Sequence, residues 1–303
     1  MLGSPGPSAL ESGRGQPHRL QCMEIIGGNH ATEGLVSAPG LDIWVASRPF
    51  TGEAGGDVHY FSMCGSGRVT RLAMADVSGH GREVDETARR LRQLMRKYIN
   101  LLDQTRLARA INREFPQTEG TPMFATVLFA TYFAPTDHLI ICNAGHPRPI
   151  WFSTRTMSWR LLSAEASDAG PSIRNEKARY RFARVANLPL GIIEPTDYHQ
   201  FAVKLEKGDL VLLYTDALIE AANPRGVRLG EAGLLRLAEQ LEIMDPEQTG
   251  RALLKKVDEW RDHAEPDDDQ TLIVMRHNAS DPPRMTVTQA LKSTARMLGL
   301  VRV

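Results

Sequence analysis

Short apolar runs separated by turn-length gaps fill most of the chain between residues 41 and 276. Their length and their flanking turn residues are typical of strands. The predicted strands are 41–45, 58–63, 69–75, 125–133, 138–142, 149–152, 201–205, 210–214 and 270–276. We interpret 201–205 and 210–214 as one hairpin, turned by Lys207-Gly208-Asp209.

Helical periodicity replaces this pattern in two places. Apolar residues recur at helical spacing over 84–102, where basic residues crowd the remaining surface, and a short helix is predicted over 106–115. A second pair is predicted over 231–241 and 246–263. Strands in hairpin runs with helices in adjacent pairs favour a layered α+β fold over a doubly wound parallel sheet.

The chain divides into one large domain and two tails. Residues 1–20 begin with a Gly-, Pro- and Ser-rich stretch that lacks an apolar signal core, which predicts a disordered tail. Residues 21–278 form the predicted domain, in which 163–178 is a polar loop or flap. Residues 279–303 contain a weaker amphipathic helix over 285–298.

Composition excludes several classes of protein. The 36 basic residues balance the 36 acidic ones, which gives no reason to expect a nucleic-acid partner. The longest apolar stretch, 124–134, is too short to cross a bilayer. The three cysteines are widely spaced and form no zinc motif. We therefore expect a cytoplasmic protein without a membrane anchor.

Four aspartates stand where a carboxylate is costly unless it has a function. Asp57 opens one strand, Asp76 and Asp216 follow apolar strands, and Asp268 lies in an acidic turn before the last strand. Carboxylates gathered without imidazole or thiolate partners suit Mg²⁺ or Mn²⁺. Two such ions about 3.5–4 Å apart can activate a water for attack on a phosphoryl group.

Each aspartate also has an ordinary explanation. An aspartate after a strand is usually a turn former or a helix N-cap. Ser78 could cap a following helix, and residues 267–269 could form a solvated loop. Spacing alone therefore leaves the metal site open.

Seven short motifs in order are more specific than any single aspartate. Together they resemble the SpoIIE-like bacterial branch of the metal-dependent, type 2C (PPM) protein-serine/threonine phosphatases, over roughly residues 41–276. The motifs are Gly55-Gly56-Asp57, Asp76-Val77-Ser78-Gly79-His80-Gly81, Asn143-Ala144-Gly145-His146-Pro147, Leu188-Pro189-Leu190-Gly191, Lys207-Gly208-Asp209, Tyr214-Thr215-Asp216 and Asp268-Asp269-Gln270-Thr271.

The resemblance implies a four-layer α-β-β-α sandwich of two antiparallel sheets flanked by helix pairs, with two Mn²⁺ or Mg²⁺ ions at one edge. By motif match, Asp76 bridges both ions and Val77 offers its backbone carbonyl. Asp57 holds one ion, while Asp216 and Asp268 hold the other. The implied reaction is attack of metal-activated water on phosphoserine or phosphothreonine of a substrate protein.

Several assignments around this set keep alternatives. Asp268 is preferred to its neighbour Asp269 because it lies three residues before Thr271. Ala217 replaces the glycine usual in the family, and would be strained if that position needs a positive φ. Arg48 is a candidate phosphate ligand, although a surface ion pair is the more ordinary role for such an arginine.

The histidines and cysteines are weighed in the same way. His80 is a candidate proton donor to the leaving group, with capping of its own turn as the more ordinary role. His146 is expected to brace its loop rather than to bind metal. Cys142 is expected to face the core rather than to act as a nucleophile.

An active phosphatase that acts on a regulatory protein of the partner-switching type is the leading functional hypothesis. A catalytically inactive phosphoprotein-binding scaffold and a small-molecule phosphohydrolase are the alternatives. Control by a separate regulatory protein is expected, with the basic side of helix 84–102 or the helix 285–298 as the docking surface.

Overall fold

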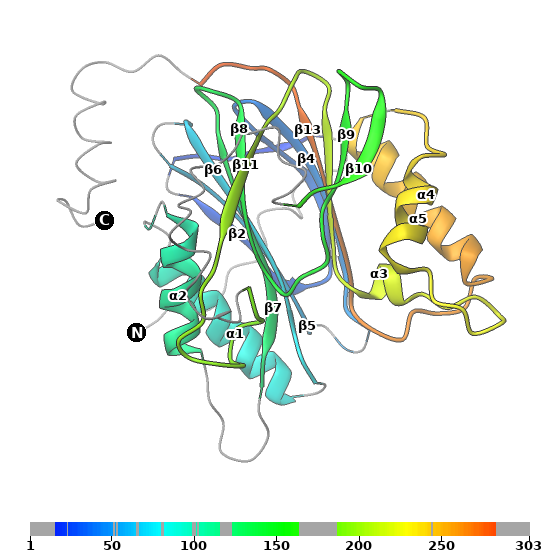
Figure 1. The fold of residues 1–303 in the computed structure, drawn as a ribbon, viewed down its shortest axis with the longest axis horizontal. Helices are drawn as coiled ribbons and strands as arrows, with labels where there is room; N and C mark the ends of the chain where they lie inside the picture. Colours follow the sequence, from blue (N-terminus) through cyan, green and yellow to red (C-terminus); the bar gives the residue numbers. More distant parts are fainter. Residues whose placement is uncertain are drawn as a thin grey trace, which may run out of the picture.

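Two β-sheets pack face to face at the centre of the protein, and helices cover both outer faces (Figure 1). This computed structural model describes residues 16–22, 24–50, 52, 54–64, 67–79, 82–98, 101, 103–115, 123–163, 187–243 and 245–282. The arrangement is the α+β sandwich that the sequence predicts, with four layers in the order helices, sheet, sheet, helices.

The first sheet, sheet A, has seven strands in the order β1-β3-β4-β13-β12-β9-β10. All its neighbours are antiparallel except the short pair β1–β3. Its strands are β1 (His18–Arg19), β3 (Thr32–Ala38), β4 (Leu41–Arg48), β9 (Ile150–Ser153), β10 (Ser158–Leu161), β12 (Leu210–Tyr214) and β13 (Gln270–His277). Helices α4 (Gly230–Ala238) and α5 (Pro246–Trp260) cover its outer face, and the short α3 (Ala217–Glu220) follows β12.

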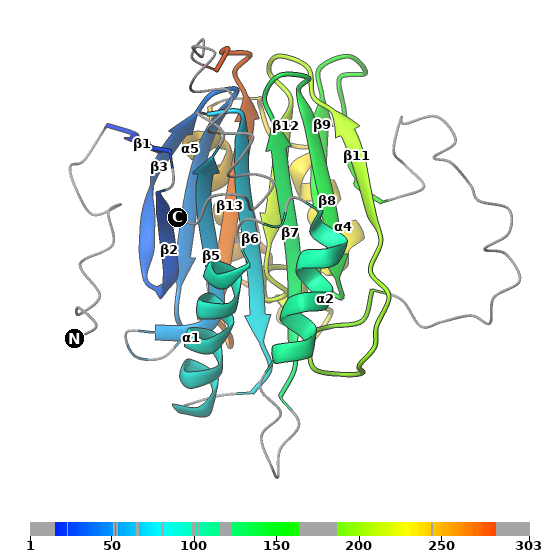
Figure 2. The same ribbon diagram turned by 90° about the vertical axis from the view of Figure 1, so that its left-hand side faces the viewer.

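The second sheet, sheet B, has six antiparallel strands in the order β11-β8-β7-β6-β5-β2. Its strands are β2 (Ile25–His30), β5 (Ala54–Cys64), β6 (Val69–Val77), β7 (Ala125–Phe133), β8 (His138–Ala144) and β11 (Gln200–Lys204). Helices α1 (Arg82–Lys97) and α2 (Gln104–Glu114) lie across its outer face (Figure 2).

Three apolar clusters hold the layers together. The central cluster lies between the sheets and includes Phe61, Met74 and Ile273. The other two join each sheet to its own helices, around Leu91 for sheet B and Leu253 for sheet A. Because both sheets are buried on both faces, long stretches of their central strands are apolar without interruption.

The predicted hairpin of 201–205 and 210–214 is wrong. Phe201 pairs with Ile141 in sheet B, whereas Leu210 pairs with Arg276 in sheet A. The Lys207-Gly208-Asp209 turn therefore carries the chain from one sheet to the other. A turn residue pattern shows that the chain reverses, but it does not show which strands will pair.

The sequence patterns did not predict four of the strands, namely β1, β2, β3 and β10. β2 contains Gly27 and Gly28 and β1 has only two residues, so neither gives a clear alternating pattern. The predicted tail 1–20 is wrong at its end, because His18 and Arg19 pair with Val36 and Ser37.

Helix α1 ends five residues before the predicted end at residue 102. Tyr98 and Leu101 keep the helical spacing of apolar residues because both pack on the same cluster after the helix has ended. Asp103 then caps α2 by accepting from the backbone N–H groups of Thr105 and Arg106. The predicted helix 285–298, most of the loop 163–178 and most of the tail 1–20 lie outside the described residues. No helix in the described part of the chain is long and apolar enough to span a membrane.

Asp209 fixes the crossing between the two sheets. Its buried carboxylate accepts hydrogen bonds from Trp151 Nε1 at 3.1 Å, from the Thr154 backbone N–H at 2.8 Å and from the Glu206 backbone N–H at 3.0 Å. We expect Asp209→Ala to lower the free energy of unfolding by about 2–4 kcal/mol, because these buried donors lose their acceptor. Urea denaturation measures this change. The exposed control Glu242→Ala should stay within about 0.5 kcal/mol of wild type, and an equal effect of both variants would contradict the assignment.

Candidate metal centre

Each sheet contributes two of the four predicted aspartates to one edge of the sandwich. Asp57 on β5 and Asp76 on β6 stand directly opposite each other in the antiparallel register of sheet B. In sheet A, Asp216 comes two residues after the end of β12, and Asp268 lies two residues before β13. Because β12 and β13 are neighbours, the second pair is also close in the sheet.

The four carboxylates interact electrostatically. Burial raises the pKa of Asp57 well above its usual value, and repulsion by Asp76 adds to the effect. Burial, followed by repulsion from Asp216 and Asp268, raises the pKa of Asp76 to about 7. Burial, followed by repulsion from Asp268, raises the pKa of Asp216, and burial also raises that of Asp268. The two sheets therefore bring all four acids into one cluster.

This cluster fits a divalent cation better than any alternative partner. No Arg, Lys or His in the described part of the chain forms a salt bridge with any of the four carboxylates. Among the described side chains, no three acids, imidazoles or thiols converge tightly enough to hold one ion as they stand. Mutual repulsion keeps bare carboxylates apart, and bound cations would remove it.

Buried hydroxyl groups hold Asp57 across the gap between the sheets. Thr215 Oγ1, at the end of β12, donates to Asp57 Oδ2 at 2.9 Å. The same Oγ1 accepts from the backbone N–H of Thr271 at 2.9 Å, and Thr271 Oγ1 lies 2.9 Å from Ser47 Oγ. Thr215 and Thr271 are fully buried. This network ties sheet A to the carboxylate that sheet B presents.

The carboxylate of Asp269 accepts hydrogen bonds from the backbone next to Asp57. Its carboxylate accepts from the Phe50 N–H at 2.7 Å and from the Gly56 N–H at 2.5 Å, and the Asp57 N–H lies 3.4 Å away. A Cβ atom on Gly55 would lie 2.3 Å from Asp269 Oδ2, so only glycine leaves room for this contact. These bonds support Asp268, rather than Asp269, as the carboxylate free to bind metal.

The turn after Asp76 is tied to β7 and not to helix α1. Ser78 donates its backbone N–H to the Phe124 carbonyl at 2.9 Å, and Ser78 Oγ accepts from the Phe124 N–H at 3.0 Å. Helix α1 begins at Arg82, so Ser78 does not stand at its N-cap position, and the helix-capping alternative for Ser78 is wrong. A Cβ atom on Gly56 would lie 2.9 Å from the carbonyl oxygen of Val77, which shows how closely the backbone approaches that predicted ligand.

A family model matches the part of the chain that contains three of the four aspartates, Asp76, Asp216 and Asp268. The family model described as Stage II sporulation protein E (SpoIIE) matches residues 66–278, which is more than half of the 303-residue chain. The chain belongs to the SpoIIE family. It is thus a member of the type 2C phosphatases that its motifs resemble, whose members depend on Mn²⁺ or Mg²⁺.

Two curated proteins illustrate the relationship. The SpoIIE-family chain is 26% identical over 245 residues to the phosphoserine phosphatase RsbU of Bacillus subtilis, covering 78% of this chain and 63% of RsbU. It is 28% identical over 99 residues to Stage II sporulation protein E of the same organism, covering 33% of this chain and 12% of that protein. The chain therefore spans less than two thirds of either relative.

Solved structures confirm the fold of this SpoIIE-family chain. The RsbU and RsbW domains of Rv1364c from Mycobacterium tuberculosis match with a TM-score of 0.63 and 23% identity, over 90% of this chain and 70% of that one. The PP2C phosphatase domain of SpoIIE from Bacillus subtilis matches with a TM-score of 0.62 and 18% identity, over 84% and 71%. At these identities the likeness shows the shared sandwich.

The backbone around Asp216 answers two questions that the sequence raises, namely whether Ala217 is strained and whether Asp216 caps a helix. Ala217 is the first residue of α3 and is not among the described residues with a positive φ, so the substitution for glycine causes no strain there. The Asp216 side chain forms no cap hydrogen bond to α3. Asp216 itself stands at the N-cap position of α3, so the ordinary explanation holds for its position but not for its side chain.

His146 and Cys142 have structural roles, as expected. His146 Nδ1 lies 2.9 Å from Thr126 Oγ1, and the Asn143 side chain bonds both the N–H and the carbonyl of His146. Burial lowers the pKa of His146 to about 3, so the ring is neutral. Cys142 is fully buried, and burial raises the pKa of its thiol to about 12. A thiol in that state is not a nucleophile.

Of the remaining two predicted residues, Arg48 and His80, the structure describes only Arg48. Arg48 is the last residue of β4 and stands opposite Gln270, beside the acidic turn, with an exposed side chain. It therefore lies at the correct edge for phosphate. His80 lies outside the described residues, so its role stays a prediction.

Three polar residues with a role at this edge were missed. Thr215, Thr271 and Asp269 all occur in the quoted motifs. Their spacing gives no sign that Thr215 bonds Asp57, that Thr271 bonds Thr215 or that Asp269 bonds the backbone of Asp57. Glu220 of α3 also repels Asp76 and Asp216, although Arg228 lies 2.8 Å from its carboxylate. A glutamate at the end of a four-residue helix gives no such indication in the sequence.

The raised pKa of Asp76 makes a prediction about pH. A carboxyl whose folded pKa is about 7, against 3.8 unfolded, binds more protons in the folded state between those values. Metal-free protein should therefore lose stability as pH rises from about 5 to 8. Asp76→Asn should reduce this loss and should stabilise the metal-free protein at pH 8 by about 1 kcal/mol, or roughly 2–4 °C in Tm.

Thermal unfolding in a chelator at pH 5 and pH 8 measures both effects. The exposed substitution Glu242→Asn is the control and should leave the pH dependence unchanged. If Asp76→Asn and wild type lost stability equally over this range, Asp76 would not be part of a repelling cluster.

Proposed function

We propose that this SpoIIE-family chain is an active, Mn²⁺- or Mg²⁺-dependent protein-serine/threonine phosphatase. One observation carries the proposal: four buried or half-buried carboxylates from two sheets gather at one edge, and no described basic side chain pairs with them. Such a cluster destabilises the metal-free fold, and it becomes favourable when divalent cations bind.

The ligand set that the geometry supports is Asp57, Asp76, Asp216 and Asp268 with the carbonyl of Val77. When two ions are bound, they supply activation of a water and neutralisation of the phosphoryl charge. The chain positions its own groups for this chemistry. Asp76 lies within electrostatic reach of the other three, which suits a bridging role.

Groups around the cluster complete the proposed site. Thr215 and Asp269 fix Asp57 in place through a side-chain bond and backbone bonds. Arg48, at the end of β4, is proposed to bind the phosphate of the substrate, and His80 is proposed to donate a proton to the leaving oxygen. The first follows from its exposed place beside Gln270, and the second rests on the motif alone.

Exposed aromatic side chains beside the cluster favour a protein substrate over a small phosphate ester. Phe50, whose N–H bonds Asp269, is 55% exposed. Phe124, whose backbone pairs with Ser78 two residues after Asp76, is 37% exposed. Exposed apolar rings on segments bonded to an acidic site suit the side chains that flank a phosphoserine in a polypeptide.

The proposed partner is a phosphoserine- or phosphothreonine-bearing regulatory protein in the cytoplasm. The name of the relative RsbU describes it as a phosphoserine phosphatase, and a structural neighbour joins an RsbU domain to an RsbW domain. Another neighbour belongs to the bacterial stressosome. These relatives support a substrate of the partner-switching type, together with a separate regulatory protein.

Metal-dependent hydrolysis distinguishes the proposal from an inactive scaffold. We expect purified protein to hydrolyse p-nitrophenyl phosphate and a phosphoserine peptide in Mn²⁺ or Mg²⁺ titrations. Asp76→Asn should lower the rate by at least on the order of 10²–10³, because a shared metal ligand is lost. Circular dichroism checks that the variant folds.

Calorimetric titration with Mn²⁺ provides the second readout. Wild type should bind about two ions, and Asp76→Asn should bind more weakly. Near wild-type turnover of Asp76→Asn at saturating Mn²⁺ would refute its assignment, and absence of both turnover and metal binding in the wild type would favour the scaffold.

Phe124 provides a test of the protein-substrate assignment. We compare a phosphoserine peptide flanked by leucines with one flanked by glycines. Wild type should prefer the leucine peptide in kcat/KM, and Phe124→Ala should reduce that preference by about tenfold, because one apolar contact is removed. Ile243→Ala, which removes an equally exposed apolar side chain from another part of the surface, should leave the preference unchanged. Equal behaviour of both variants would argue for a small-molecule substrate.

A further inference from the structure

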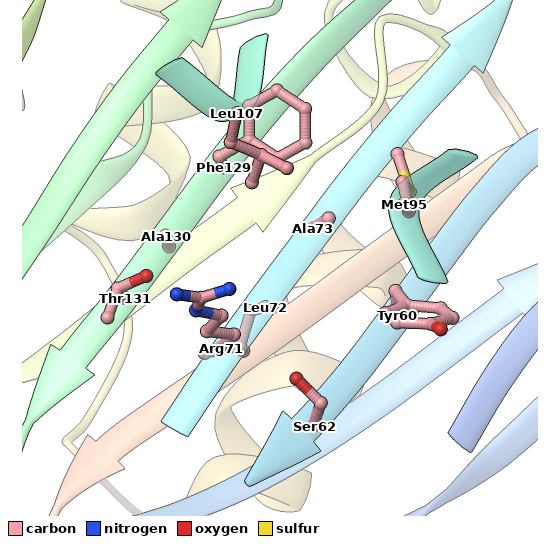
Figure 3. Close-up of a pocket in the computed structure, with 10 residues that line it drawn as sticks. All are labelled: Tyr60, Ser62, Arg71, Leu72, Ala73, Met95, Leu107, Phe129, Ala130 and Thr131. Carbon is pink, nitrogen blue, oxygen red and sulfur yellow. The ribbon is translucent and has the colours of Figure 1, made fainter. Parts of the chain in front are cut away.

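A small cavity lies between sheet B and its two helices, away from the acidic edge. Its volume is about 20 Å³, and strands β5, β6 and β7 form its floor (Figure 3). Met95 of α1 and Leu107 of α2 line its helical side, together with Ala73 and Phe129. The lining is mostly apolar, with the exception of one row of polar residues.

That row crosses three strands in register. Arg71 of β6 stands directly opposite Ser62 of β5 on one side and Thr131 of β7 on the other. All three side chains are buried. In Figure 3 the guanidinium of Arg71 lies between Ser62 and Thr131 and points into the cavity.

The guanidinium of Arg71 is only partly satisfied. Its Nη2 donates to the Leu101 carbonyl at 2.7 Å, but Nε and Nη1 have no hydrogen-bond partner within the described part of the chain. The residue is only 7% exposed, so bulk water does not reach these donors freely. A buried arginine with two unused donors is unusual, because each unpaired donor is costly.

No acidic side chain among the described residues forms a salt bridge with Arg71. Burial lowers the pKa of Arg71, and the one opposing influence comes from the Cys64 thiol rather than from a carboxylate. A guanidinium nevertheless stays protonated in proteins, so the cavity holds a buried positive charge. Such a charge requires an anion close to it.

We propose that this cavity is a binding site for a small inorganic anion of the size of chloride, held by Arg71 and by the hydroxyl groups of Ser62 and Thr131. A cavity of about 20 Å³ admits one water-sized occupant, and phosphate is too large for it. A water molecule would satisfy donors but would leave the charge unbalanced. The site is separate from the phosphatase centre and does not depend on its activity.

An anion bound there would stabilise the contact between sheet B and the segment that joins α1 to α2. Leu101 lies between the end of α1 and the start of α2, and its carbonyl bonds Arg71. An anion that neutralises Arg71 lowers the cost of keeping the guanidinium under the helices. The folded state is then stabilised in proportion to anion occupancy.

Thermal unfolding of the full chain tests this site. Melting curves are measured in sodium chloride and in sodium gluconate at equal ionic strength, since gluconate is too large for the cavity. We expect wild type to melt roughly 2–4 °C higher in chloride. Arg71→Met should abolish that difference. Arg106→Met, on the exposed surface of α2, should keep it. An equal chloride effect in both variants would overturn the proposal.

A direct measurement covers the case in which Arg71→Met fails to fold. Crystals of wild type grown in sodium bromide should show an anomalous peak within hydrogen-bond distance of the Arg71 guanidinium, and Thr131→Val should weaken it. A peak of ordinary density without anomalous signal would identify a water and overturn the proposal. A bromide peak that Thr131→Val leaves unchanged, or one found only at surface arginines, would overturn the assigned site.

Discussion

Repulsion among four carboxylates at one edge is the constraint on which the rest of this structure depends. Burial and like charge both raise the pKa of Asp57 and Asp76, so the bare site works against folding. The apolar cluster between the sheets supplies the opposing stabilisation, because it fixes the two strand pairs that present the acids. Asp57 and Asp76 lie on paired central strands, so they cannot move apart without disrupting that apolar cluster. Rigid strand ends thus hold a costly charge arrangement in the place where the proposed metal ions would bind.

Polar groups next to the acids complete this support. Thr215, at the end of a strand of sheet A, donates a hydrogen bond to Asp57 on sheet B. Asp269 accepts a hydrogen bond from the backbone N–H of Gly56, the residue before Asp57. Gly55 and Gly56 are needed because a side chain at either position would collide with Asp269 or with the Val77 carbonyl. The Gly-Gly-Asp motif therefore encodes a close approach of neighbouring segments as well as the proposed metal ligand Asp57. Two adjacent aspartates, Asp268 and Asp269, consequently differ in role.

Local patterns predicted most of the elements, but they could not predict all of the pairing. The central strands β5, β6 and β7 are long and apolar, and their positions follow directly from the sequence. The assignment of β11 and β12 to different sheets does not, because Asp209 secures that crossing through contacts with distant residues such as Trp151. The gathering of the four aspartates was predictable from motif order. The bonds of Thr215 and Asp269 were not, since they join residues more than 150 positions apart.

The positive charge of Arg71 is buried toward the other end of β5 and β6, the two strands that carry Asp57 and Asp76. The register that places Asp57 opposite Asp76 also places Ser62 opposite Arg71, five residues along β5, or about 17 Å for an extended strand. Helix α1 covers both places, since Val84 lies against Gly56 and Met95 lines the cavity at Arg71. Neither charge has a described side chain that neutralises it. If the proposed cation and anion sites are occupied, ions from solution balance both charges beneath α1, a cation at one end and an anion at the other.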